Sequence, residues 1–247
     1  MNVGRRLVGT AKKTKTAVGP GVNIHPVLSE EVIMNLCRPR LTLLWFALIG
    51  GLCISGAVGQ GGSGPDWVPL FNGKNLDGWE KVGAEKWVVE DGTIYGEGIS
   101  PKYGYLATEK TYTDFDLSLQ FKCEASGNSG VFIHTTFEPG TTTVSKGRQI
   151  EIDRMVGSHT GGLYGDGRGW IVWPAPELET VIRPDSWNKM RIKVVGNRHI
   201  VYLNGTQMID FTYPSPGATK GVIALQLHSG GEGRMRFKDL WIRDLAQ

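Results

Sequence analysis

Cysteine is scarce in this sequence, with three among 247 residues. Cys37 and Cys53 lie in an N-terminal segment that we expect to be removed, which leaves Cys123 alone in the rest of the chain. A single cysteine excludes an intramolecular disulfide, so the fold must depend on its hydrophobic core. The remaining length of about 190 residues suffices for one such core.

Helical periodicity longer than a turn or two is missing after Trp67. Short alternating runs appear instead, separated by turn residues such as Asp91-Gly92, Gly196-Asn197 and Asn204-Gly205. This pattern predicts an all-β antiparallel meander. Because no helices are available to cover a sheet, two sheets must cover each other, as in a β-sandwich or jelly roll.

An excess of basic residues is also missing outside the N-terminal segment. Seven of the 27 basic residues and two of the 24 acidic residues precede Val58, so the net charge of +3 comes from that segment. The rest of the chain holds 20 basic and 22 acidic residues. We therefore expect no nucleic-acid partner.

One long apolar run is present, from Leu41 to Leu52, and it follows Arg38 and Arg40. The small residues Ser55-Gly56-Ala57 come next, at the spacing that a signal peptidase reads. This order predicts a secretory signal peptide cut after its last alanine. An uncleaved membrane anchor is the alternative, because the run barely approaches the roughly 20 residues that a spanning helix needs. Its glycines favour cleavage.

The sequence then divides into segments. We expect a leader made of an extension over residues 1–33 and a signal peptide over 34–57, with Met34 as the true start. A glycine-rich linker over 58–65 precedes a single domain over 66–245. We expect the mature protein to be exported to the periplasm or the extracellular space, and to have no membrane partner after cleavage.

Alternation in one predicted strand separates polar from apolar side chains. Ile150 and Ile152 point to one face, while Gln149, Glu151 and Asp153 point to the other. Turning two carboxylates inward without partners is costly, so this polar face must meet solvent, a metal or a polar ligand. A solvated sheet face is the ordinary interpretation of such a strand taken alone.

A second strand shows the same arrangement and strengthens the case for a site. Leu225 and Leu227 share one face, and Gln226 and His228 share the opposite one. We expect the polar faces of the two strands to form one cluster.

A glycine-rich segment over residues 157–173 lacks alternation and predicts a long loop over one sheet face. Tyr164, Trp170 and Trp173 lie on or beside it, and aromatic rings pack well on the C–H faces of sugars. His159 in the same loop is interpreted as an exposed residue and His199 as a surface residue of a hairpin. Three other tryptophans lie among alternating apolar residues and are predicted to be core: Trp87, Trp187 and Trp241.

A series of seven motifs resembles the 3-keto-disaccharide hydrolase domain family. The motifs follow the family's order: FNGKNLDGW, WVVEDGTIYG, YLATEKTYTDFDLSLQFK, NSGVFIHT, TGGLYG, WNKMRIKVVGNRHIVYLNG and GVIALQLHSGGEGRMRFKDLWI. The resemblance implies a concanavalin A-like jelly roll, an exported bacterial protein, and cleavage of glycosides already oxidised to a ketone at C3.

Individual residues match the family's motifs. Asn128 and Gly130 match its NSG turn, Tyr164 matches its TG-x-x-Y loop, and Gln226 and His228 match its LQ-x-H strand.

Two positions depart from the family's pattern. The family has Glu and then Gln two residues later where this chain has Gln149 and then Glu151, and it has Arg where this chain has His134. These departures suggest either a different substrate or a domain that binds sugar without cleaving it. A non-catalytic carbohydrate-binding module is thus the alternative function.

The resemblance implies elimination rather than ordinary glycoside hydrolysis. A ketone at C3 acidifies the C2 proton, so the site needs a base, a donor to the enolate oxygen and an acid for the leaving oxygen. Glu151 or Asp153 is the predicted base, and His228 or His134 is the predicted acid or donor. Other residues are predicted to bind substrate together with His134: Gln149, Tyr164, Trp170, Trp173 and Gln226.

The predicted partner is a 3-keto-disaccharide or related glycoside, and no cofactor is expected. Glu151, Asp153 and His228 could gather a metal ion, and jelly rolls often bind Ca²⁺. None of these residues has metal-ligand spacing, so a metal is left unassigned.

Overall fold

The computed structural model describes residues 64–125, 127–165, 167–214 and 217–246. The predicted signal peptide, the extension before it and most of the linker lie outside these residues. Among the described residues, no helix is both long and apolar enough to cross a membrane.

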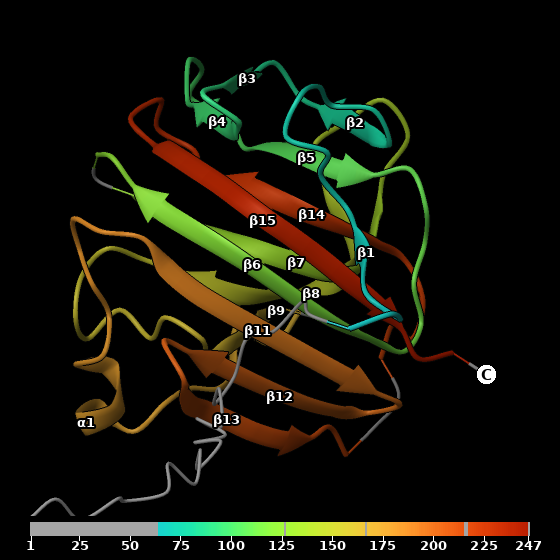
Figure 1. Ribbon diagram of the computed structural model, residues 1–247, viewed down its shortest axis with the longest axis vertical. Helices are drawn as coiled ribbons and strands as arrows, with labels where there is room; N and C mark the ends of the chain where they lie inside the picture. Colours follow the sequence, from blue (N-terminus) through green and yellow to red (C-terminus); the bar gives the residue numbers. More distant parts are fainter. Residues whose placement is uncertain (1–63, 126, 166, 215–216, 247) are drawn as a thin grey trace, which may run out of the picture. The chain divides into compact units, whose positions relative to one another are not determined.

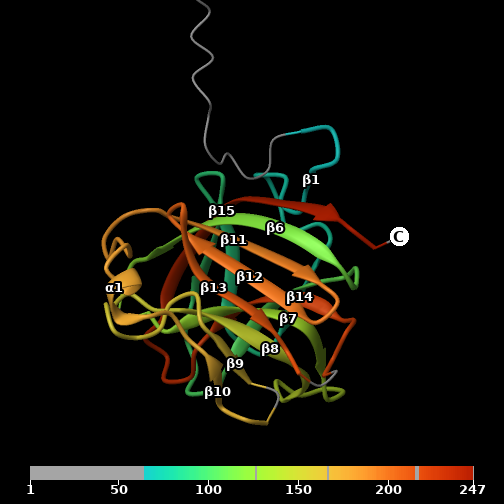
Figure 2. The same cartoon turned by 90° about the horizontal axis from the view of Figure 1, so that it is seen from below.

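The chain folds into two antiparallel sheets packed face to face, seen edge-on in Figure 2. This arrangement confirms the predicted all-β sandwich. The eight-stranded sheet, in front in Figure 1, has the order β13 (Thr206–Thr212), β12 (Arg198–Leu203), β11 (Asn188–Val195), β6 (Phe115–Cys123), β15 (Arg234–Asp244), β4 (Thr93–Glu97) and β3 (Lys86–Glu90), with β1 (Val68–Pro69) paired to β15.

The seven-stranded sheet lies behind it and carries the polar strands. Its order is β10 (Trp170–Val172), β9 (Leu163–Gly165), β8 (Val144–Ile152), β7 (Ser129–Phe137), β14 (Val222–Leu227), β5 (Gly104–Thr108) and β2 (Trp79–Val82). The described residues contain one short helix, α1 (Pro176–Glu179). The loop predicted over 157–173 is therefore only partly irregular, because β9 and β10 extend the sheet from it.

The core lies between the sheets and follows the predicted alternation. Ile150, Ile152, Leu225 and Leu227 are all 0% exposed. Burying each such side chain stabilises the fold by roughly 1.5–3 kcal/mol, and a one-residue slip would turn the whole set outward. The hydrophobic pattern therefore fixes which face of β8 and β14 is free for a site.

The predicted hairpin turns are confirmed. Asp91-Gly92 joins β3 to β4 with φ values of 50° and 70°, and Asn204-Gly205 joins β12 to β13 with 51° and 89°. Two consecutive positive φ values match the twist of antiparallel strands, which is why Asn-Gly and Asp-Gly occur there. Gly196-Asn197 joins β11 to β12.

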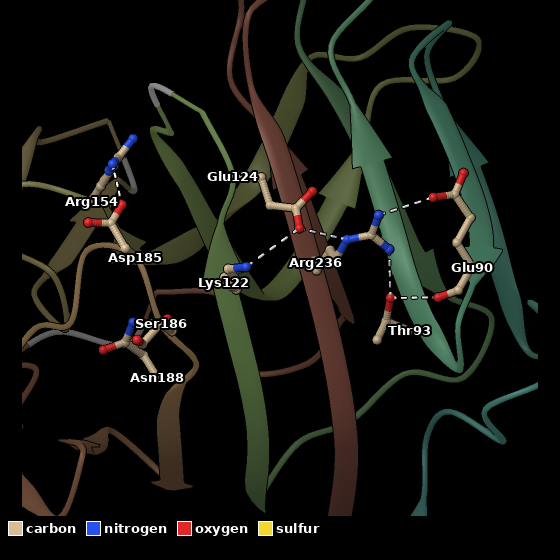
Figure 3. Close-up of polar contacts among 9 residues, drawn as sticks. All are labelled: Glu90, Thr93, Lys122, Glu124, Arg154, Asp185, Ser186, Asn188 and Arg236. Carbon is tan, nitrogen blue, oxygen red and sulfur yellow. Dashed lines mark hydrogen bonds and ion pairs between the residues drawn. The ribbon is translucent and has the colours of Figure 1, made fainter.

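The outward face of the eight-stranded sheet is held by ion pairs, drawn in Figure 3. Arg236 on β15 reaches Glu90 at 3.1 Å and Glu124 at 2.8 Å, and Lys122 lies 3.8 Å from the same Glu124. Partly exposed pairs of this kind contribute little individually. These charged side chains pair with one another and remain partly exposed, so we interpret this face as a solvated surface.

Three residues differ from the sequence predictions in burial. Trp241, predicted to be core, is half-buried. Trp187 is only half-buried, because it packs on the outer face with Lys238 Nζ 4.3 Å from its ring centre. His199, predicted at the surface, is fully buried, and its Nε2 lies 3.0 Å from Arg148 Nη1. Burial, followed by the charge of Arg148, lowers the pKa of His199 to about 4.

Candidate active site

Glu151 lies on the free face of β8 and is 4% exposed. Its two carboxyl oxygens each accept a hydrogen bond from a neighbouring amide. Asn128 Nδ2 donates to Oε1 at 2.9 Å, and Gln149 Nε2 donates to Oε2 at 2.6 Å. Gln149 also approaches the Ser129 carbonyl at 3.3 Å, so the carboxyl group is held in one orientation.

The ionisation of Glu151 is strongly perturbed. Burial, reinforced by the negative charge of Asp153, raises its pKa to about 8, although its two amide donors act in the opposite direction. A carboxylate with such a pKa is a far stronger base than an exposed one. Perturbation of this kind, in a cleft, is typical of catalytic acids and bases.

Glu151 opens into a cleft of about 380 Å³ on the seven-stranded sheet. Strand alternation predicts that five polar residues on β8, β14 and just past their ends share one face, and this is confirmed, since all five line this cleft. The lining consists of Tyr103, Asn128, Gln149, Glu151, Asp153, Ser158, His159, Tyr164, Trp170, Gln226 and His228.

Unsatisfied polar atoms also point to a ligand. Asn128 Oδ1 and Gln226 Oε1 are buried and have no hydrogen-bond partner among the described residues. Tyr105 pairs with Gln226 in the sheet, and burial raises the pKa of Tyr105 to about 12. Buried acceptors without partners are uncommon in folded proteins and suit the hydroxyl groups of a bound sugar.

His228 stands just beyond the end of β14 and contacts Tyr103. Its Nε2 lies 3.4 Å from the Tyr103 hydroxyl, and its Nδ1 lies 3.0 Å from the Ser229 carbonyl. The two rings meet edge to face with centroids 4.9 Å apart. The pair presents polar atoms to the cleft from the side of β5 and β14.

Aromatic side chains form the opposite wall. Tyr164 is 41% exposed, Trp170 is 37% exposed and Trp173 is 50% exposed. Tyr164 and Trp170 meet edge to face at 5.4 Å, and both line the cleft. Trp173 stacks on His159 with ring centroids 5.4 Å apart and extends this wall outward.

The prediction that His134 lies on the binding face is wrong. His134 is 1% exposed, its Nε2 lies 2.6 Å from the Thr113 carbonyl, and its ring packs edge to face on Phe115 in the core. A β-bulge interrupts the pairing of β7 with β8 between Ile133 and Thr136, and His134 has a φ of 51°. The extra residue reverses the alternation, so the side chain turns inward.

Sequence reasoning missed four contributors to the cleft: Tyr103, Asn128, Ser158 and His159. The NSG motif marks Asn128 only as a turn residue, and the sequence predicts His159 to be merely exposed. His159 instead pairs with Glu179, which is 4% exposed, at 2.8 Å. The sequence marks only Asn128, through the NSG turn. The other residues reach the cleft through contacts between segments far apart in the sequence, which no local pattern predicts.

The arrangement can support proton transfer at a bound sugar. It combines a buried carboxyl group with raised pKa, two histidines, unsatisfied amide oxygens and aromatic rings. Among the described residues, no cluster of three His, Cys, Asp or Glu side chains is placed to hold a metal ion.

These features define a jelly-roll sandwich with a polar, aromatic-walled cleft on one sheet. The chain belongs to the family described as the 3-keto-alpha-glucoside-1,2-lyase-like domain, whose model matches residues 66–243.

Known proteins agree with this assignment. A 3-keto-disaccharide hydrolase from Bacteroides thetaiotaomicron is 32% identical over 76 residues, which are 27% of this chain and 26% of that protein. The chain thus matches about a quarter of that relative's length. A crystal structure from Parabacteroides distasonis, provisionally assigned as a glycosyl hydrolase, has a TM-score of 0.58 and 24% identity over 73% of this chain and 94% of its own.

A carbohydrate-binding module from Bacillus subtilis shares the fold at lower identity. Its TM-score is 0.52 with 13% identity, over 69% of this chain and 98% of its own. Both solved structures are less than 25% identical to this chain, so their likeness concerns the fold alone, because one fold hosts both enzymes and binding modules.

Proposed function

We propose that this protein is an exported enzyme that cleaves 3-keto-glycosides by elimination and hydration. One observation carries the proposal: Glu151 is a buried carboxyl group at the wall of a sugar-sized cleft, with its pKa raised to about 8. A binding module needs aromatic rings and amides, but it has no use for such a base. The family and the name of the B. thetaiotaomicron relative support the same chemistry.

The reaction begins at C2 of the oxidised sugar. The C2–H bond breaks, the proton passes to the Glu151 carboxylate, and the electron pair forms an enolate with the C3 carbonyl. The enolate then re-forms the carbonyl, its electrons make a C1=C2 double bond, and the C1–O bond breaks. Water adds across that double bond, with its hydroxyl going to C1 and a proton to C2.

Glu151 suits the first step because its conjugate acid has a pKa near the operating range of a general base. The Asn128 and Gln149 amides hold both carboxyl oxygens, which fixes the direction of attack. Asp153 lies beside it on the same face and raises its basicity through charge. We assign Asp153 this supporting role.

The enolate oxygen requires a hydrogen-bond donor, and we assign this role to the Tyr103 and His228 pair. Tyr164 and Trp170 would pack on the sugar's C–H face, with Trp173 extending that surface. Gln226 Oε1 and Asn128 Oδ1 would accept hydrogen bonds from sugar hydroxyls.

The fate of hydrogen at C2 tests the elimination. When a 3-keto-glucoside is cleaved in D₂O, hydration of the double bond places deuterium at C2 of the released sugar, which mass spectrometry detects. Free 3-keto-glucose incubated without enzyme controls for spontaneous exchange. Enzymatic cleavage with no deuterium at C2 above that control would refute the mechanism.

The same assay separates the enzyme from a binding module. A module would retain keto-sugars in equilibrium dialysis and release no product. Retention without cleavage would therefore leave the cleft as a sugar site and end its assignment as an enzyme.

A further inference from the structure

His159 occupies a strained backbone position beside the cleft. Its φ is 64°, in the left-handed region, which costs a residue other than glycine on the order of 1 kcal/mol or more. Such strain persists only where surrounding contacts fix it, and it is concentrated at functional sites. The hydrogen bond from Gly162 N–H to the His159 carbonyl, at 2.8 Å, holds this turn.

Glu179 orients the histidine. This residue ends the short helix α1 and is 4% exposed, although it carries a carboxylate. Its Oε2 accepts the His159 backbone N–H at 2.9 Å, and its Oε1 lies 2.8 Å from His159 Nδ1. A carboxylate bound to Nδ1 fixes the tautomer of an imidazole and stabilises its protonated form.

The ring is also held from both sides. Trp170 meets it edge to face at 4.9 Å, and Trp173 stacks on it at 5.4 Å. With Nδ1 bound to Glu179, Nε2 has no hydrogen-bond partner among the described residues, while the residue lines the cleft that contains Glu151. Nε2 is therefore free to bind a ligand in the cleft, and it carries a proton to donate when the ring is an imidazolium.

We propose that His159, oriented by Glu179, is the general acid that protonates the departing oxygen of C1. This inference rests on the proposed function. As the C1–O bond breaks, the electron pair leaves with the oxygen, and the Nε2–H bond of the imidazolium supplies the proton. The neutral imidazole left behind regains a proton from water before the next cycle. Glu179 is a positioning residue, because it acts through His159.

His228 fits this role less well. Its Nδ1 bonds to the Ser229 carbonyl and its Nε2 faces the Tyr103 hydroxyl, so both nitrogens already have neutral partners. The structure shows no carboxylate within hydrogen-bond distance of its ring in the described part of the chain, whereas His159 has a buried one. The two histidines thus differ in the partner of Nδ1, which is a buried carboxylate for His159 and a backbone carbonyl for His228.

Leaving-group dependence tests the proposal. We would compare 4-nitrophenyl and methyl 3-keto-glucosides, in both anomeric forms, because nitrophenolate departs without protonation and methoxide does not. His159→Asn keeps a residue that tolerates positive φ. It should slow methyl glycoside cleavage by about 10²- to 10⁴-fold and nitrophenyl cleavage by less than about tenfold. Glu179→Gln should show the same selectivity more weakly.

A control variant and the wild-type rate separate this test from general damage to the protein and from failure of the proposed function. Asp210→Asn removes an exposed ion pair with Arg198, neither of which lines the cleft, and should leave both rates unchanged. Equal losses on both substrates in His159→Asn and Glu179→Gln, or no loss at all, would overturn the acid assignment. Absence of wild-type activity on every 3-keto-glucoside would instead refute the proposed function.

Discussion

At the scale of single residues, Glu151 is the centre of the site because burial and a neighbouring charge act on it together. Two side-chain amides hold both of its carboxyl oxygens and so fix the orientation of this base. We expect Glu151→Gln to lower kcat on a 3-keto-glucoside by about 10²- to 10⁴-fold. Substrate affinity, measured by isothermal titration with the variant, should change little, because the amide keeps the side chain's shape.

Asp153 and Asp210 give comparison variants for this prediction. Asp153→Asn removes a nearby charge and should reduce the rate only modestly, while Asp210→Asn should have no effect. Full activity in Glu151→Gln together with a large loss in Asp153→Asn would transfer the role of base to Asp153.

The same residue predicts how stability depends on pH. The pKa of Glu151 is about 8 in the folded chain, against 4.5 for an unperturbed glutamate. The folded state therefore keeps a proton that the unfolded chain releases, so stability falls as pH rises from about 4.5 to about 8. The Glu151→Gln variant has no carboxyl group at this position, so it lacks this contribution to the fall in stability. We expect the variant to melt above wild type at pH 9 and to approach it at pH 4.5.

This difference between variants cancels the titration of groups common to both chains, including the buried His134 and His199. A melting difference that stays constant from pH 4.5 to pH 9 would show that Glu151 is not protonated preferentially in the folded state.

At the scale of elements, the pairing of β7 with β8 positions the carboxyl group of the site, and this pairing depends on a glycine. Gly130 pairs with Glu151, and a Cβ at Gly130 would come within 2.6 Å of Gln149 Cγ. Only glycine there lets the Gln149 side chain lie across β7 and reach the carboxyl group. We expect Gly130→Ala to displace Gln149 and lower kcat by about 10- to 100-fold. Circular dichroism melting should change little, because that side chain can move.

Gly96→Ala is the matched control, because its Cβ would meet the Trp87 ring at 2.6 Å in the other sheet. That buried ring has little room to move, so this variant should lose stability while the folded fraction keeps normal kcat. A parallel loss of stability and activity in Gly130→Ala would mean that the glycine serves the fold alone.

Elements also show where sequence reasoning succeeds and where it fails. Alternation predicts the two faces of β8 and β14, because uninterrupted strands have a period of two. It fails for His134, where a bulge with positive φ inserts one residue without a glycine to signal it. The His159 and Glu179 pair joins an irregular loop to a helix of four residues, and no local pattern records such a contact.

At the scale of the whole molecule, the fold was predictable because turn residues and strand periodicity agree along the chain. The cleft was partly predictable, since its floor is made by two alternating strands. Its aromatic wall depends on how β9 and β10 fold back, which loop composition does not specify.

Export is a prediction at this scale too. N-terminal sequencing of natively expressed protein should find a mature chain beginning near Val58, in the periplasmic or extracellular fraction. The matched variant replaces two leucines of the apolar run, Leu43 and Leu44, with arginine and should retain uncleaved protein in the cytoplasm. A native chain that begins at Met1 or retains its leader would contradict export by a cleaved signal peptide.

The central claim is that the cleft uses the acidity conferred by a ketone at C3. The most direct measurement compares kcat/KM of the purified protein on 4-nitrophenyl 3-keto-glucoside and on the unoxidised 4-nitrophenyl glucoside. The ketone alone makes the C2 proton removable, so we expect cleavage of the keto-sugar and at least about 10³-fold less activity on its parent. Equal activity on the two substrates would contradict the account.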